Sequence, residues 1–212
     1  MKIHHKNIIL RDMVEGDIED DIRWQTSETE WQLWDEPWEL PNTAADSAPA
    51  AATAPASRPD TEDLRRRALA EFALIEQLRK EDDFRWTLEI DYEDGTHIGS
   101  VDSYYIDQEF NKVRQKDAQA KAPLFYALGI AIYEPAFWGR GLGTQALEAY
   151  IQHHFEHHHD PLFLQTWSGN HRMLRCAEKM GFYLVERRAG VREVRGELYD
   201  ALTFRLDLKS KS

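Results

Sequence analysis

A glycine-rich turn between an apolar strand and a helix constrains the fold of this 212-residue chain more than any other feature. Residues 124–132 are mostly apolar, and Trp138-Gly139-Arg140-Gly141-Leu142-Gly143-Thr144 then leads into a helical pattern. Glycines before a helix N-terminus let backbone N–H groups approach an anion, and the helix dipole adds partial positive charge. The sequence therefore predicts that a phosphate-bearing ligand sits on backbone amides of this turn.

Two common phosphate-binding motifs do not fit the turn. A P-loop needs Lys and Ser or Thr after a longer glycine spacing. A dinucleotide-binding motif needs three glycines at another spacing and an acid downstream for the ribose. For the glycines taken alone, an ordinary tight strand–helix turn stays the alternative.

A second motif lies further along the chain. Trp167-Ser168-Gly169-Asn170 follows a short apolar run at 162–164 and precedes a predicted helix over 171–180, which ends at Gly181-Phe182. Asn170 suits the N-cap of this helix, and Gly181 suits its C-terminal end. The two motifs occur in a fixed order, so together they are more specific than either alone.

The pair of motifs resembles the GNAT superfamily of N-acetyltransferases, in the branch of ribosomal-protein N-terminal (RimJ/RimL-like) acetyltransferases. The acetyl-CoA loop of this family reads Q/R-x-x-G-x-G/A, and Trp138 stands here where Gln or Arg is usual. The resemblance covers 85–206 well and the first forty residues loosely. It implies an α+β fold, with a mixed, mostly antiparallel central sheet of about seven strands, flanked by helices and splayed between the fourth and fifth strands.

Hydrophobic patterns place the other elements along the chain. Strands are predicted at 7–13, 84–92, 97–105, 124–132, 162–164, from 183 onward and at 198–208, and helices at 18–25, 61–80, 144–157 and 171–180. The segment 41–60 is rich in Ala, Pro and Ser and predicts a flexible insertion. The length favours a single domain over 1–212.

Composition narrows the classes of partner. The formal net charge is −12, which argues against general nucleic-acid binding and fits a cationic partner such as an amine, although acidity can also serve solubility alone. Cys176 is the only cysteine, so no internal disulfide can form. The chain shows neither a signal peptide nor an apolar run long enough for a bilayer, so we expect a cytoplasmic protein without a membrane partner.

The resemblance implies that acetyl-CoA is the cosubstrate and that a primary amine attacks it directly in a ternary complex. In the family, pantetheine pairs with the central strand, backbone amides of the glycine turn hold the diphosphate, and the asparagine reaches the pantetheine arm or an ordered water. The corresponding residues here are Ile130, Ala131, Ile132, Trp138, Gly139, Arg140, Gly141, Leu142, Gly143, Thr144 and Asn170.

Acetyl transfer also needs a proton acceptor for the amine and a donor for the thioester oxygen. By position, Asp102, Glu134 and Glu89 are the candidate bases, and Ser168 is a candidate substrate ligand. Many relatives use a Tyr in the last helix as the acid, but this chain has Ala177 there. Tyr199, Tyr133 or solvent must then protonate the leaving thiolate.

An aromatic and acidic stretch at 24–40 predicts the acceptor site. Aromatic faces attract an alkylammonium ion and carboxylates neutralise it. The alternative is an amphipathic helix that sends its tryptophans into the core. The candidate acceptor ligands are Trp31, Trp34, Glu36 and Trp38.

The sequence leaves the acceptor and the broader class open. A polyamine or aminoglycoside-like amine and a protein N-terminus are both candidates, and a non-catalytic acyl-CoA-binding module is an alternative from another class. A third hypothesis is metal binding by the histidines at 153, 154, 157, 158 and 159, although we expect no metal site. A monomer or homodimer is expected.

Overall fold

The computed structural model describes residues 1–35, 37–39, 61–80, 84–114, 117 and 123–208. Their strands form one sheet in the order β1-β2-β3-β4-β6-β7-β9-β8, and β5 pairs with β4. The strands are β1 (Lys2–His5), β2 (Ile8–Arg11), β3 (Thr87–Tyr92), β4 (His97–Ile106), β5 (Lys112–Val113), β6 (Phe125–Ile132), β7 (Leu162–Trp167), β8 (Tyr183–Val194) and β9 (Glu197–Leu206).

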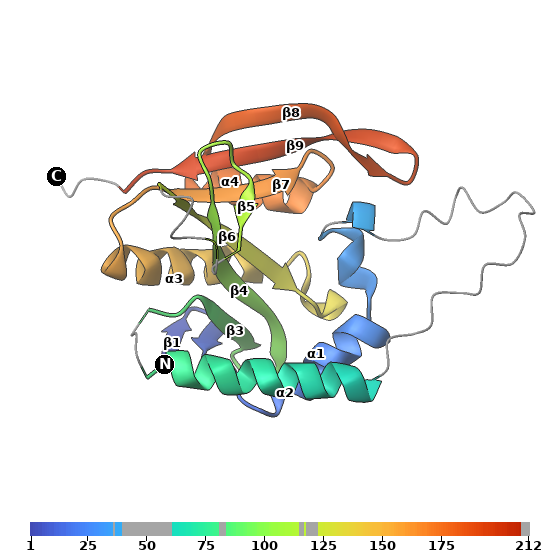
Figure 1. Ribbon diagram of the computed structural model, residues 1–212, viewed down its shortest axis with the longest axis vertical. Helices are drawn as coiled ribbons and strands as arrows, with labels where there is room; N and C mark the ends of the chain where they lie inside the picture. Colours follow the sequence, from blue (N-terminus) through green and yellow to red (C-terminus); the bar gives the residue numbers. More distant parts are fainter. Residues whose placement is uncertain (36, 40–60, 81–83, 115–116, 118–122, 209–212) are drawn as a thin grey trace, which may run out of the picture.

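Four α-helices and several short 3-10 helices accompany the sheet in the described residues (Figure 1). They are α1 (Asp17–Thr26), α2 (Thr61–Leu78), α3 (Leu142–His157) and α4 (His171–Met180), with η1 (Glu30–Leu33), η2 (Pro37–Glu39) and η4 (Pro135–Phe137). None of these helices combines the length and the apolar character that crossing a bilayer requires.

The predicted α+β fold is confirmed, and all but one of the strand pairings are antiparallel. The structure adds two strands to the predicted set of about seven. β1 was missed because its sequence, KIHH, does not alternate clearly between apolar and polar residues, and β5 because it has only two residues. The predicted strand at 84–92 begins later, at Thr87.

The parallel pair β6·β7 is short, and its two strands separate. The register joins Tyr126 to Leu162, Ala127 to Phe163 and Leu128 to Leu164, and in the described ladder no further pair follows. These strands are the fourth and fifth of the predicted set, so the predicted splay lies where it was expected. From Gly129 onward, no strand of the described residues pairs with this edge of β6, which leaves backbone hydrogen-bonding groups there for a ligand.

Apolar side chains fill the layer between one face of the sheet and α3. Leu10, Leu88, Leu128 and Leu147 lie in this core, and Tyr150 is fully buried among them. Each fully buried side chain of this kind contributes about 1.5–3 kcal/mol through the removal of apolar surface from water. The layer fixes α3, and therefore its N-terminus at the glycine turn, against β6.

The opposite face of the sheet is polar where α1 covers it. Arg11, Glu89, Asp91 and His97 extend from β2, β3 and β4 toward this helix, and the last three are at most 8% exposed. α2 packs outside α1 and has no buried residue (Figure 1). The Ala/Pro-rich segment predicted at 41–60 lies outside the described residues.

Candidate active site

The glycine turn ends in the first residues of α3. Gly139 and Gly141 adopt left-handed backbone conformations, with φ of 73° and 77°. Gly141 is the N-cap of α3 and carries no side chain that could satisfy the helix end. Among the described residues, no backbone acceptor meets the N–H groups from 139 to 144, and the first helical bond is donated by Gln145 to Gly141. The turn therefore offers free amides at a helix N-terminus, which suits an anion.

Aromatic contacts hold both sides of this turn. The indole of Trp138 donates a 2.7 Å hydrogen bond to the carbonyl of Ile132, which ties the turn to the end of β6. The guanidinium of Arg140 lies over the rings of Tyr92 and Phe137, at 4.7 and 5.1 Å from their centroids. Arg140 is thus positioned by stacking beside the free amides.

Backbone direction along β6 decides which residues face the gap. The N–H of Tyr133 donates to the carbonyl of Ile98, so the backbone groups of Tyr133 point toward β4. Backbone groups alternate in direction along a strand, so those of Ala131, two residues earlier, also point toward β4. A Cβ at Gly99 of β4 would clash with the carbonyl oxygen of Ala131. The backbone groups of Ile130 and Ile132 therefore point toward the gap. Of the three residues predicted to pair with pantetheine, Ala131 is placed unfavourably, because its backbone is directed to β4.

Asn170 has two hydrogen-bonding roles in the structure. Its Oδ1 accepts from the N–H of Met173 at 3.1 Å, which confirms the predicted N-cap of α4. Its Nδ2 donates to the carbonyl of Trp34 at 3.2 Å, and the indole of Trp167 donates to the same carbonyl at 3.0 Å. The backbone beside η1 thus takes one of the two N–H donors of the amide group that the resemblance assigns to pantetheine.

Asp102 lies where β6 and β7 separate. A Cβ at Gly129 would clash with Oδ1 of Asp102 and would lie 3.2 Å from its Cγ, so the carboxylate rests on the bare backbone of Gly129. Gly129 directly follows the last pair of the β6·β7 ladder. Burial raises the pKa of Asp102, and the charge of Lys112 acts in the opposite direction. A raised pKa at this position suits a proton acceptor.

The other candidate catalytic residues have different surroundings. Glu134 accepts from the indole of Trp24 at 2.9 Å and pairs with Arg23 at 2.8 Å, so it anchors α1. Ser168 accepts from the backbone N–H of Asp200 at 3.0 Å and joins β7 to β9. Tyr199 packs edge-on against Trp167, with 4.8 Å between the ring centroids.

A cleft of about 330 Å³ opens beside Trp167 and Tyr199. Its walls come from η1, the glycine turn, the β7–α4 corner and the β8–β9 hairpin. The charged side chains on its walls are Glu30, Arg172 and Arg195, and the aromatic ones are Trp34, Trp138, Trp167 and Tyr199. The cleft therefore lies between the glycine turn and the region predicted to bind the acceptor.

The predicted acceptor residues divide between this cleft and other contacts. Trp34 lines the cleft, whereas Trp31 donates to the carbonyl of Trp24 at 2.9 Å and packs inside against Tyr133. Trp38 lies under Arg192, whose Cζ is 4.2 Å from the ring centroid. Glu36 lies outside the described residues.

Arginines of the chain cover the aromatic faces that the sequence predicted for an alkylammonium ion. The Cζ of Arg172 lies 4.3 Å from the ring centroid of Trp34 and 4.5 Å from that of Trp138. Sequence reasoning missed this stack because Trp34, Trp138 and Arg172 are far apart in the chain, and no local pattern links them.

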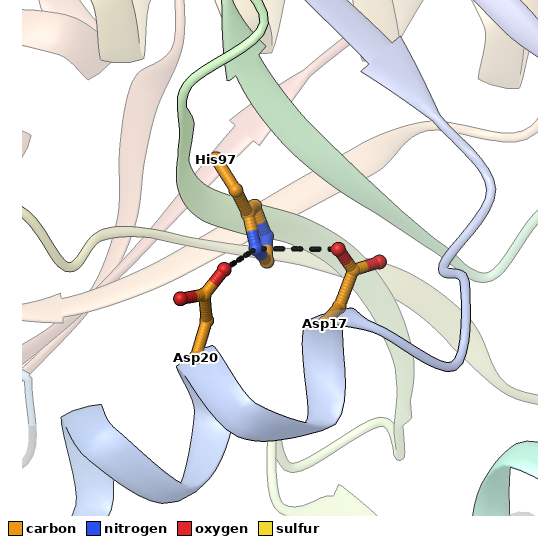
Figure 2. A group of neighbouring side chains, drawn as sticks. All are labelled: Asp17, Asp20 and His97. Atoms are coloured by element: carbon orange, nitrogen blue, oxygen red, sulfur yellow. Dashed lines mark hydrogen bonds and ion pairs between the residues drawn. The ribbon is translucent and has the colours of Figure 1, made fainter.

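Figure 2 shows a charged cluster between α1 and β4 that the sequence also did not predict. Nδ1 of His97 lies 3.1 Å from Asp20 and 3.5 Å from Asp17, and its Nε2 lies 3.1 Å from Glu89. Burial acts to lower the pKa of His97, but hydrogen bonds and charges from these carboxylates raise it above its usual value. The imidazolium therefore links α1 to the sheet.

The same cluster has the composition of a metal site. Ligand atoms of Asp17, Asp20 and His97 lie within 4.8 Å of one another. However, Arg11 donates to both carboxylate oxygens of Asp17, at 2.7 and 2.8 Å. A cation would have to displace this guanidinium, so the arrangement fits an ion-pair cluster better than a metal site.

Next to this cluster, Asp21 and Tyr133 face the same polar layer. Burial, followed by the charge of Glu89, raises the pKa of Asp21 to about 7. Burial also raises the pKa of Tyr133, whose hydroxyl is hydrogen-bonded to Ser100 at 2.9 Å. These shifts reflect a layer with more carboxylates than cations.

The histidine cluster near the C-terminus of α3 is largely packed among aromatic rings. Phe84 stacks on His153 with 5.4 Å between centroids, and Tyr126 meets His154 edge-on at 4.9 Å. Burial lowers the pKa of His153 to about 4 and that of His154 to about 3. Among the described residues, the set of three possible metal ligands comes from the α1–β4 cluster and not from these histidines.

Comparisons with solved structures agree with this arrangement. The fold is similar to that of RimL, the ribosomal L7/L12 α-N-protein acetyltransferase, in complex with coenzyme A, with a TM-score of 0.64 and 13% identity over 98% of each chain. A ribosomal-protein-S5-alanine acetyltransferase from Vibrio fischeri gives a TM-score of 0.64 and 12% identity, covering 98% of this chain and 96% of that one.

A third similar structure is yncA from Salmonella typhimurium, a putative acetyltransferase with acetyl-CoA, with a TM-score of 0.57 and 15% identity over 98% of this chain and 97% of that one. At these identities the likeness concerns the fold. No curated protein sequence matches the chain. A family model described as the acetyltransferase (GNAT) domain matches residues 7–183, which is most of the sequence. The chain therefore belongs to the GNAT family of acetyltransferases.

Proposed function

We propose that this protein transfers the acetyl group of acetyl-CoA to the α-amine of a protein or peptide N-terminus. The observation that carries the proposal is the gap between β6 and β7, which begins at Gly129 under Asp102. The free amides at 139–144 follow β6, and the cleft beside Trp167 lies at the end of β7, so both lie on the side where the two parallel strands separate. Such an arrangement has room for a diphosphate, a pantetheine strand and an amine.

In the proposed reaction, coenzyme A binds along the gap. Backbone amides of the glycine turn hold the diphosphate, with the N-terminus of α3 adding partial positive charge. The backbone N–H and C=O of Ile130 and the N–H of Ile132 pair with the pantetheine arm, whereas the carbonyl of Ile132 stays on the indole of Trp138. Arg140 supplies a nearby positive charge from its stacked position. Nδ2 of Asn170 donates one N–H to the carbonyl of Trp34, and its second N–H is the donor for pantetheine.

Asp102 is the proposed general base. It takes a proton from the ammonium, and the neutral nitrogen then attacks the thioester carbonyl carbon to form a C–N bond. A backbone N–H in the stretch 129–132 stabilises the oxyanion. The nitrogen of the intermediate loses its remaining extra proton to solvent, the C–S bond breaks as the intermediate collapses, and the coenzyme A thiolate takes a proton from Tyr199, Tyr133 or solvent. Ala177 is fully buried and has no proton to give.

The stacked arginines favour a protein N-terminus over a polyamine. A polyamine would compete with Arg172 and Arg192 for the same ring faces. RimL and the S5-alanine enzyme, whose fold this chain shares, are described as acetyltransferases of ribosomal proteins. A non-catalytic acyl-CoA-binding module is the second candidate, favoured by Ala177 at the position where many relatives have the acid.

Thiol release from acetyl-CoA tests the proposal with a panel of N-terminal peptides, polyamines and aminoglycosides. We expect turnover with peptides, and Asp102→Asn should lower kcat by about 10²–10⁴-fold while coenzyme A affinity stays unchanged. Binding of coenzyme A without turnover on any amine would support the binding module. Turnover on polyamines alone would overturn the choice of acceptor.

A further inference from the structure

The cleft beside Trp34 carries a charge opposite to that of the whole chain. The formal net charge is −12, yet the Arg and carboxylate side chains on the cleft wall are Arg172, Arg195 and Glu30. Two guanidinium groups against one carboxylate attract an anion in a partly enclosed site. An acceptor that entered this cleft with several positive charges would be repelled.

The stacking of Arg172 leaves its hydrogen-bonding edge available. Its Cζ lies 4.3 Å from the ring centroid of Trp34 and 4.5 Å from that of Trp138, and these cation–π contacts hold the guanidinium in place without using a hydrogen bond. The N–H groups of a guanidinium form a planar fork that matches a carboxylate. Within the described part of the chain, Arg172 forms no ion pair. The stack therefore holds a preorganised donor on the cleft wall.

Arg195 reaches the cleft from a different element. It occupies the turn of the β8–β9 hairpin with φ of 54°, and Gly196 follows with φ of 80°. Two successive positive φ angles define a tight hairpin turn with a fixed direction. The hairpin thus presents Arg195 to the cleft across from η1, and Tyr199 of β9 lines the same wall.

We propose that Arg172 and Arg195 form a carboxylate-binding subsite that selects acceptors with an acidic group close to the reactive amine. This inference rests on the proposed function, and it adds the chemistry of the acceptor. Glu30 attracts the ammonium on entry, while the two arginines bind the carboxylate. That carboxylate has two sources with the same chemistry: an acidic side chain in the first residues of a peptide, or the free α-carboxylate of an amino acid.

Matched acceptors separate these sources. Rates of thiol release are measured for an N-terminal peptide with Asp and Glu at its second and third positions and for the same peptide with Asn and Gln. A free amino acid is compared with its amide. The variants are Arg195→Gln and Arg195→Glu, because Arg195 is exposed and its replacement leaves the Trp34 stack in place. Arg66→Gln on α2, 75% exposed and outside the cleft, is the control.

We expect kcat/KM for the acidic peptide to exceed that for the neutral one by about tenfold, the effect of one charge-assisted hydrogen bond. Arg195→Gln should remove most of this preference, Arg195→Glu should invert it, and Arg66→Gln should preserve it. The preference should also shrink between about 10 mM and about 1 M salt, because the electrostatic screening length falls from about 30 Å to about 3 Å. A preference only for the free amino acid over its amide would assign the α-carboxylate as the source.

Equal rates on acidic and neutral acceptors, or an unchanged preference in Arg195→Glu, would overturn the subsite and leave the proposed function standing. Absence of thiol release with every amine would overturn the proposed function. In that case, quenching of tryptophan fluorescence by the acidic and neutral peptides still decides the subsite, since Trp34 and Trp138 line the cleft. Equal affinity of the two peptides would then refute it.

Discussion

At Gly129, the missing side chain sets the position of a carboxylate. Asp102 rests against the backbone at the point where β6 and β7 separate, and a Cβ at Gly129 would occupy the space of Oδ1. A glycine in the interior of a strand often marks such a close approach. The proposed base therefore depends on a residue that does no chemistry itself.

Gly129→Ala should lower kcat by at least about tenfold, because Asp102 must move away from the gap and a displacement of 1 Å can cost more than this. Affinity for coenzyme A should change little. Steady-state kinetics measures kcat, and melting curves with and without coenzyme A measure the affinity. Gly16→Ala, where an added Cβ meets no atom within 4 Å, is the control. Equal losses of kcat in both variants would contradict the role of Gly129.

Gly141→Glu should weaken coenzyme A binding by at least about tenfold, because an acidic side chain enters an anion site at a helix N-terminus. Gly141 has φ of 77°, so the substitution also strains the backbone. Gly95→Glu in the β3–β4 turn, with φ of 88° and open space around it, imposes the same strain elsewhere. Titration calorimetry compares the two variants, and equal affinities would remove the glycine turn from the diphosphate site.

At the scale of elements, α1 is held to the sheet by buried charges. His97 pairs with Asp17 and Asp20 of α1 (Figure 2). Its other ring nitrogen pairs with Glu89 of β3. His97→Leu should lower the free energy of unfolding by about 3–5 kcal/mol, since it leaves the buried carboxylate of Glu89 without the imidazolium that pairs with it. Urea denaturation at pH 7 measures this loss. Arg65→Gln, at an exposed pair between α2 and α1, should change stability little, and an equal loss there would contradict the role of His97.

The buried histidines of α3 predict a loss of stability in acid. The folded pKa values of His153 and His154, about 4 and about 3, lie below the unfolded value of about 6.5. Between the folded and unfolded pKa values, the unfolded chain therefore binds more protons than the folded chain, and the free energy of unfolding falls as the pH drops below about 6.5. No such loss arises from these two groups above that pH, where both states are neutral.

His154→Phe should remove part of this acid sensitivity. Between pH 6.5 and pH 5, one buried histidine of this kind lowers the free energy of unfolding by about 2 kcal/mol. Over this range the free energy of unfolding of the variant should therefore fall by about 2 kcal/mol less than that of the parent chain. Urea denaturation at both pH values gives the difference. Asp21, whose raised pKa has the opposite effect, is present in both proteins and cancels. The exposed His159→Phe is the control, and equal slopes in all three proteins would contradict the prediction.

At the scale of the whole molecule, the sequence predicted what depends on local pattern. The glycine turn and the cap at Asn170 were found because each is a short run with a definite composition, whereas the splay was expected from the resemblance to the family. The Arg172 stack and the His97 cluster could not be found, because they join residues from distant segments with no common pattern. The direction of the Ala131 backbone depends on strand register, which the sequence does not specify.

The hydrogen bond between Asn170 and the carbonyl of Trp34 makes two binding events interdependent. Nδ2 of Asn170 carries two hydrogens, so one can stay on the carbonyl of Trp34 while the second, in the proposed function, reaches the cosubstrate. Linkage then works in both directions: whatever immobilises the aromatic wall alters the affinity for the cosubstrate, and the bound cosubstrate alters the hold on that wall by the same factor. In the proposed function, a single asparagine thus couples loading of the cosubstrate to the order of the wall that meets the acceptor.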